Sequence, residues 1–190
     1  EEVLEQWKEK GRIAIEQGNR VHDYAETLAS YYKGFMKEIK SPQDFKELGV
    51  YQWFTDLDKD RYDVLATELP IYHQVDNIEE EGEANFAGTA DAVFYDRVKE
   101  GLVIIDWKTN AAKNLFKVYK KAKMFAPFEE LEDNNFNHYQ IQLSLYRMAF
   151  EAKGFKVVDT RVVWTGDTPG KDFKCYREYP TENLTSQLKE

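Results

Sequence analysis

The feature that most constrains the fold is a run of four apolar residues, 102–105, that ends directly in an aspartate, a tryptophan and a lysine. Four consecutive apolar side chains fit a strand covered on both faces better than an edge strand. Residues two apart in a strand share a face, so Asp106 and Lys108 project together while Trp107 points the other way. The sequence therefore predicts a buried strand that carries an acid and a base on one face at its carboxyl end.

Strand patterns lie on both sides of this run. The two before it are joined by a charge-rich turn, and with the strand at 102–109 they predict a three-stranded meander. A helix at 137–154, ended by Gly154, connects the meander to the strands that follow, and it supplies a right-handed crossover if its flanking strands are parallel. The four other strands are expected at 65–75, 86–96, 156–166 and 173–180.

The first third of the chain is predicted to be helical. Small and apolar residues recur at steps of three and four over residues 7–32, which predicts an amphipathic helix, either continuous or broken near Gly11 or Gly18. Ser41 as an N-cap predicts a second, short helix that ends near residue 48.

This order of elements predicts an α/β fold with a central mixed sheet of about five strands flanked by helices, preceded by an N-terminal helical region. A chain of 190 residues is about the size of one domain. We expect a single domain with a helical part at 1–63, a sheet core that carries the active site at 64–180, and a C-terminal helix at 181–190.

Composition argues against several classes of protein. Cys175 is the one cysteine, so an internal disulfide, a cysteine-held zinc site and an iron–sulfur cluster are not expected. The net charge of −9 argues against a protein that coats nucleic acid indiscriminately, but it allows an acidic site neutralised by metal ions. The sequence has no apolar run of about 18 residues and no visible leader, so we expect an intracellular chain that does not span a membrane.

A second carboxylate precedes the apolar run by one hairpin. Asp91 follows the small residues 88–90, which allow close approach of a ligand or a neighbouring backbone. Two nearby carboxylates are costly unless protons or a divalent metal ion lie between them. Asp91 and Asp106 therefore predict a metal site, and the structural alternative is a salt bridge between Asp106 and Lys108 at the strand exit.

Other polar residues are candidates for the same site. His22 lies on the small, apolar side of the first helix, where it is either a hydrogen-bonded core residue or a metal ligand. Glu68 lies inside a predicted strand and has the solvent face as its alternative. Gln142 and Tyr146 are four residues apart on one face of the later helix, as substrate contacts or as a polar shoulder of a packed helix.

Four short motifs occur in a definite order. They are "GNRVH" on the first helix, "GTADAV" and "IIDWKT" on neighbouring strands, and "YQIQLSLY" on the later helix. In this order they resemble the RecB-like branch of the PD-(D/E)XK nuclease superfamily, and within it the mitochondrial genome maintenance exonucleases and related phage and bacterial exonucleases. The resemblance extends from His22 to Tyr146, about two thirds of the chain, and implies a restriction-endonuclease-like core.

The resemblance also implies roles for the matching residues. Asp91, Asp106 and Lys108 match the catalytic residues, and Lys108 is the lysine that orients or helps to deprotonate the attacking water. The implied metal ligands are His22, Asp91, Asp106 and the backbone carbonyl of Trp107, with Glu68 as a further candidate. The implied substrate contacts on the later helix are Gln142 and Tyr146, with Tyr139 as a further candidate.

These residue types suit the hydrolysis of a phosphodiester. Carboxylate oxygens suit Mg²⁺ or Mn²⁺, and the imidazole of His22 favours tolerance of Mn²⁺. One ion is sufficient for a minimal mechanism, and a second would stabilise the leaving 3′ oxygen. Relatives with an iron–sulfur cluster use four cysteines, which this chain lacks.

A lysine-rich segment directly follows the site. Its lysines either form a solvated helical face or, with Phe116 and Tyr119, line the path of a single DNA strand through phosphate attraction and base stacking. The lysines proposed to contact the substrate are Lys113, Lys117, Lys120 and Lys121.

The sequence thus predicts a metal-dependent DNA exonuclease that acts on single-stranded or end-frayed DNA in recombination, repair or phage DNA processing. The alternatives are a structure- or sequence-selective endonuclease of the same fold and a non-catalytic nucleic-acid-binding scaffold. A helicase or recombination protein is a candidate partner, because the chain has no nucleotide-binding loop of its own. The expected location is the cytoplasm of a bacterial or phage-infected cell, or an organelle. Polarity of digestion, DNA versus RNA preference and oligomeric state are left open.

Overall fold

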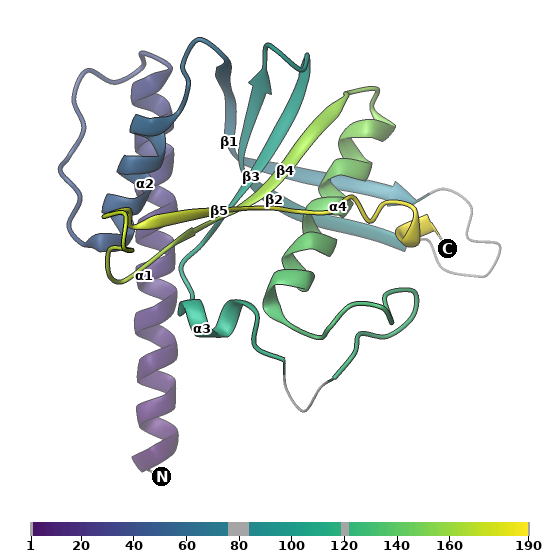
Figure 1. The fold of residues 1–190 in the computed structure, drawn as a ribbon, viewed down its shortest axis with the longest axis horizontal. Coiled ribbons are helices and arrows are strands. Elements are labelled where there is room, and N and C mark those ends of the chain that lie inside the picture. Colours follow the sequence, from purple (N-terminus) through teal and green to yellow (C-terminus); the bar gives the residue numbers. More distant parts are fainter. Residues whose placement is uncertain (1, 76–83, 119–121, 190) are drawn as a thin grey trace. The chain divides into compact units, whose positions relative to one another are not determined.

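A computed structural model describes residues 2–75, 84–118 and 122–189 (Figure 1). The described helices and strands follow one another in the order that the sequence predicts, with one additional short helix after the third strand. In chain order they are α1 (Glu2–Tyr32), α2 (Phe45–Asp56), β1 (Tyr62–Val75), β2 (Ala84–Asp96), β3 (Gly101–Lys108), α3 (Ala112–Leu115), α4 (Asn135–Ala152), β4 (Val157–Thr165), β5 (Tyr176–Pro180) and the 3₁₀ helix η1 (Gln187–Lys189).

The predicted meander is confirmed. The strands form one sheet in the order β1-β2-β3-β4-β5, and β2 pairs antiparallel with both β1 and β3. Every residue of β3 from Gly101 to Trp107 is buried. This strand lies in the middle of the sheet, so its continuous apolar run is covered on both faces, as such runs require.

The sheet is mixed because β3 and β4 run in the same direction. At the start of the two strands the Leu102 N–H donates to the Lys156 carbonyl over 2.7 Å. At their far ends the Trp164 indole N–H donates to the Asn110 carbonyl, also over 2.7 Å. The first residues of β3 thus lie beside the start of β4, and the residues after β3 lie beside the end of β4, so the two strands are parallel. Parallel neighbours need a long crossover connection, and α4 lies in the segment that provides it.

The helical region differs from the prediction at its second helix. Helix α1 is continuous through Gly11 and Gly18, so the predicted alternative of a break is wrong. Helix α2 begins at Phe45 and its N-cap is Asp44, whose side chain accepts a hydrogen bond from the Glu47 N–H over 2.9 Å. Ser41 is a plausible cap by residue type, but Asp44 has the extended backbone and the aligned carboxylate that satisfy the first turn.

The C-terminal segment also differs from the prediction. In place of an α-helix over 181–190, the described residues contain the three-residue 3₁₀ helix η1. Leu184 is buried, and its N–H is held by the Ser144 hydroxyl of α4 over 3.0 Å. This segment is therefore ordered by contacts with α4, and its own helical hydrogen bonds are few.

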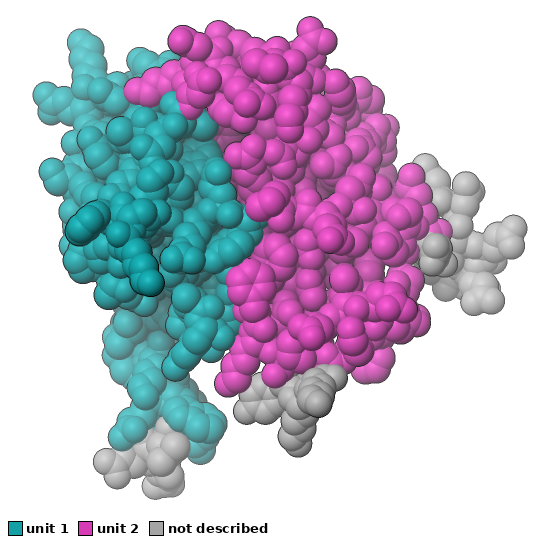
Figure 2. All heavy atoms as spheres, in the orientation of Figure 1, with its two compact units in different colours: residues 1–57, 107–115, 163–179 teal, residues 58–106, 116–162, 180–190 magenta. Residues whose placement is uncertain are grey.

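The chain divides into two compact units, each built from segments that are distant in sequence (Figure 2). Unit 1 consists of residues 1–57, 107–115 and 163–179, and unit 2 of residues 58–106, 116–162 and 180–190. The expectation of a single domain with parts at 1–63, 64–180 and 181–190 stays a prediction. Among the residues described here, no helix has both the length and the apolar character that a bilayer span requires.

Each unit has its own core. In unit 1 the Trp107 ring packs edge-on against Trp53 and stacks on Phe54, with ring centroids 5.1 and 6.1 Å apart. In unit 2 the fully buried apolar side chains come from β2, β3, α4 and β4. They include Phe94, Ile104, Leu143 and Val162.

Candidate metal centre

Glu68 and Asp91 lie opposite each other on β1 and β2. The register pairs Thr67 with Ala92, so the adjacent residues Glu68 and Asp91 face one another across the two strands. An irregularity at Leu65 shifts the pairing of β1 by one residue, and without it Glu68 would face the alanine next to Asp91. Because a shift of one residue moves a side chain to the other face, this bulge aligns the two carboxylates.

Asp106 continues the same row on β3. The register of β2 and β3 pairs Ala92 with Ile105, so Asp91 and Asp106 are the next residues to face each other. Directly opposed residues of antiparallel strands project from the same face of a sheet. Glu68, Asp91 and Asp106 thus form one row across three strands of unit 2, which we call the carboxylate row.

The carboxylate row runs from the interior toward solvent. Asp106 is 1% exposed and Asp91 is 9% exposed, while Glu68 is exposed. Two buried carboxylates side by side repel each other and are poorly hydrated, and a divalent cation relieves both costs. The row therefore consists of oxygen ligands of the type that hard cations prefer.

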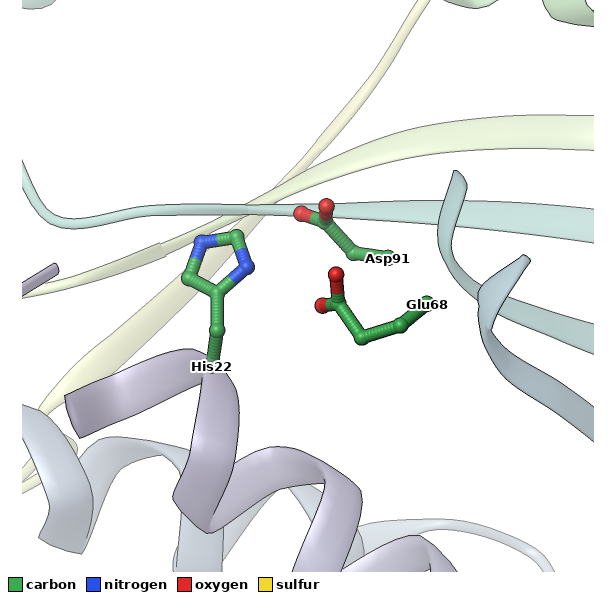
Figure 3. A group of neighbouring side chains, drawn as sticks. All are labelled: His22, Glu68 and Asp91. Carbon is green, nitrogen blue, oxygen red and sulfur yellow. The ribbon is translucent and has the colours of Figure 1, made fainter. Parts of the chain in front are cut away.

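His22 from α1 provides a nitrogen close to two members of the row. One ligand atom from each of His22, Glu68 and Asp91 lies within 4.8 Å of the others (Figure 3). Divalent ions bind such ligands at ~2.0–2.6 Å, so two ligands of one ion can be up to about 5 Å apart. His22 belongs to unit 1, whereas Glu68 and Asp91 form a pair within unit 2.

The strand exit carries Trp107 and Lys108. Trp107 is 1% exposed and its ring belongs to the aromatic core of unit 1, which leaves its carbonyl as the group that it can offer to a site. Lys108 is half-buried and, two residues after Asp106 in the same strand, projects from the same face as Asp106.

Helix α4 brings Gln142 and Tyr146 to β2. The Gln142 side-chain amide donates to the Tyr146 hydroxyl over 2.8 Å. A Cβ built on Gly88 would lie 2.6 Å from that hydroxyl, so the small residue accepts the close approach of α4. Burial raises the pKa of Tyr146 above its ordinary value, and the charges of Asp106 and Asp91 raise it further, so its hydroxyl lies within electrostatic range of both carboxylates.

The remaining sequence candidates lie on α4 and near α3. Tyr139 is half-buried one turn earlier on α4, and Lys113 and Lys117 are exposed near α3. Lys120 and Lys121 lie outside the described residues. The path for a single DNA strand along these lysines stays a prediction.

Lys46 is a buried charged residue that the sequence analysis does not identify. Its side chain is 8% exposed on α2, and its ammonium donates to the carbonyl of Thr109, next to Lys108, over 2.6 Å. The sequence shows only a lysine within a short helix, and lysine side chains are usually exposed, so its burial could not be predicted.

No protein-family model matches the chain, and no curated protein sequence matches it. The likeness to RecB-like nucleases therefore stays a prediction from the sequence motifs.

Proposed function

We propose that this chain is a Mg²⁺- or Mn²⁺-dependent deoxyribonuclease, an exonuclease that hydrolyses phosphodiester bonds in single-stranded or end-frayed DNA. The observation that supports this proposal best is the carboxylate row of Glu68, Asp91 and Asp106 on adjacent strands, with Lys108 next to it on β3. A buried acidic row followed by a base on the same face suits the binding of a cation and the activation of a water. The restriction-endonuclease-like assignment of the sheet belongs to the same proposal.

Each proposed role follows from the chemistry of the group. Asp91 and Asp106 would hold one or two ions, with Glu68, His22 and the Trp107 carbonyl as further ligands. When bound, a divalent cation lowers the pKa of a coordinated water and neutralises charge on the phosphate. Lys108 would orient the attacking water by donating a hydrogen bond to it. Gln142 and Tyr146 have N–H and O–H groups that can donate to phosphate oxygens.

Cleavage of end-labelled DNA in Mn²⁺ tests the proposal. The intact protein is expected to degrade linear single-stranded DNA and to leave circular single-stranded DNA intact, and EDTA is expected to abolish the activity. Asp106→Asn should lower the rate by about 10²-fold or more, because it removes a charged ligand at the centre of the row. The same labels, blocked at the 5′ or 3′ end, report the polarity.

Asp63→Asn is the matched control, since Asp63 lies on β1 outside the row and pairs with Arg97 over 2.6 Å. It should cleave at the parental rate. Cutting of the circle would identify the endonuclease alternative. Failure of the intact protein to cleave any DNA with either ion would contradict an enzymatic role, and calorimetric titration with Mn²⁺ would then show whether a metal-free scaffold is the better description.

A further inference from the structure

Lys46 of α2 is a buried ammonium group with several partners in unit 1. Its side chain is 8% exposed. The Nζ donates to the Thr109 carbonyl over 2.6 Å and to the Gln17 side-chain oxygen over 2.9 Å, and it forms an ion pair of 3.2 Å with Asp167. The first two contacts are hydrogen bonds, and the third is an ion pair. One side chain thus joins α1, α2, the exit of β3 and the exit of β4.

A contribution to stability does not by itself explain why a lysine is buried at this position. Moving an ammonium out of water is unfavourable, and replacing a buried ion pair by apolar side chains is often neutral or stabilising. The carboxylate of its ion pair, Asp167, is 65% exposed, so much of the attraction between them is screened by water. The shortest contact of the ammonium is to the main chain at Thr109. The more specific consequence of Lys46 is therefore the fixed position of that peptide group.

The carbonyl that Lys46 holds belongs to Thr109, the residue that directly follows Lys108. On the preceding side, the ring of Trp107 is fixed at 5.1 Å from the ring of Trp53. On the following side, Thr109 is bonded to Lys46, and its side-chain oxygen would be 3.6 Å from a Cβ on Gly18 of α1. In an extended chain, the direction of a side chain follows from the backbone of its own and neighbouring residues. The main chain is thus anchored on both sides of Lys108.

The anchoring of Lys46 is itself supported by its helix. Glu47, its neighbour on α2, receives a 2.8 Å ion pair from Arg20 of α1, and Arg20 also pairs with the N-cap residue Asp44. These contacts tie the first turn of α2 to α1 within unit 1. Lys46 therefore projects from a fixed base, as a group that positions another residue must.

We propose that Lys46 is a positioning residue, which holds the Thr109 carbonyl and thereby aims the Lys108 ammonium at the reacting water. The proposal rests on the proposed nuclease function for the role of Lys108. It adds that a residue remote in sequence, without contact to DNA or metal, sets the rate of the chemical step.

The test compares Lys46→Met with Lys156→Met in the full chain. Methionine keeps most of the buried volume of lysine but cannot donate. Lys156 is a matched control, because its Nζ also donates to a main-chain carbonyl, that of Lys99, over 2.7 Å at the other end of β3. Hydrogen exchange of the amides at 108–111, without DNA or metal, should be about tenfold faster in Lys46→Met than in the parent or the control.

Kinetics in Mn²⁺ form the second arm. Lys46→Met should lower kcat by about 10- to 100-fold and leave KM for DNA and the affinity for Mn²⁺ at parental values, because misplacing one reacting group slows the chemical step. If Lys46→Met does not fold, Lys46→Gln, whose amide is too short to replace the ammonium, enters the same assays.

Parental exchange at 108–111 in the Lys46 variant would overturn the proposal, as would faster exchange with a parental kcat. A parallel fall of kcat, Mn²⁺ affinity and melting temperature would also overturn it and assign Lys46 a structural role. If the parent protein cleaves no DNA, the nuclease function fails and so does the catalytic part of this inference, while the exchange data still decide whether Lys46 anchors the strand exit.

Discussion

At the scale of single residues, Glu68 combines a backbone cost with a favourable side-chain position. Its φ is +46° within β1, in the left-handed region that L-residues other than glycine seldom adopt. This conformation costs roughly 1–2 kcal/mol for a residue with a Cβ. The carboxylate nevertheless belongs to a residue that lies opposite Asp91 on β2. Strain of this kind is commonly retained where a side chain has a function.

Replacing Glu68 with glycine separates the two effects. Glu68→Gly should raise the free energy of unfolding in EDTA by up to about 1 kcal/mol, because glycine adopts positive φ without a steric penalty. The same variant should bind Mn²⁺ about tenfold or more weakly, since it removes one anionic ligand. Chemical denaturation and calorimetric titration measure the two quantities.

Glu100→Gly is the control for this experiment. Glu100 has a φ of +52° in the β2–β3 turn and is exposed, outside the carboxylate row. It should show the same gain in stability and no change in Mn²⁺ affinity. A loss of stability in Glu68→Gly, or unchanged affinity for Mn²⁺, would mean that the Glu68 conformation does not serve a metal site.

At the scale of elements, β2 and α4 approach each other closely at Gly88, three residues before Asp91 of the carboxylate row. Gly88 is where the two elements approach, and Tyr146, 5% exposed, is the side chain that it admits. The small residues 88–90 predict the close approach of a ligand or of a neighbouring backbone. The approaching group is instead a tyrosine side chain of α4, which no local pattern around residues 88–90 indicates.

Gly88→Ala should disturb this contact. The new Cβ would lie 2.6 Å from the Tyr146 hydroxyl and 2.8 Å from its ring, so α4 or the ring must move. We expect a loss of about 1–3 kcal/mol in the free energy of unfolding, as for other overpacked sites, together with a lower rate of DNA cleavage.

Gly11→Ala on α1 is the matched control, because a Cβ at Gly11 meets nothing within 4 Å. Alanine there should stabilise the helix by about 0.5–1 kcal/mol and leave cleavage unchanged. Wild-type stability in Gly88→Ala would show that the tyrosine ring relaxes freely and that Gly88 does not set the distance between β2 and α4.

At the scale of the whole molecule, we expect stability in acid to depend on Asp96, a buried carboxylate that lies outside the carboxylate row. Asp96, 1% exposed at the end of β2, accepts a 2.7 Å hydrogen bond from Arg61 and bonds from the N–H groups of Val98 and Lys99. The hydrogen bond from Arg61, followed by those from the two backbone groups, holds the pKa of Asp96 well below its ordinary value.

Because the folded pKa is lowered, Asp96 stabilises the fold above the unfolded pKa of about 3.9, and this contribution disappears as pH falls through the lower folded value. Asp96→Asn should therefore lose about 1–3 kcal/mol at pH 7, typical of hydrogen bonds to a charged group. The difference between variant and parent should shrink below pH ~4, as urea denaturation at several pH values can measure. A difference that is independent of pH would show that the charge of Asp96 does not contribute.

The sequence by itself determined the identity and order of most elements, and the shared face of Asp106 and Lys108, because these depend on local hydrophobic period and on strand geometry. The buried run 102–105 required a covered central strand, and β3 is one. The N-cap of α2 could not be predicted from the sequence, because Ser41 and Asp44 are both good N-cap residues by type. Only the path of the chain selects between them.

Only the tertiary structure decided which side chains share a site. The bulge at Leu65 sets the face of Glu68, and strand register is a property of two segments paired in space. Likewise, the bond from Lys46 to Thr109 joins residues 63 positions apart, so no local pattern contains it. Local interactions specify elements, whereas the alignment of a carboxylate row and the anchoring of a strand exit arise when those elements pack together.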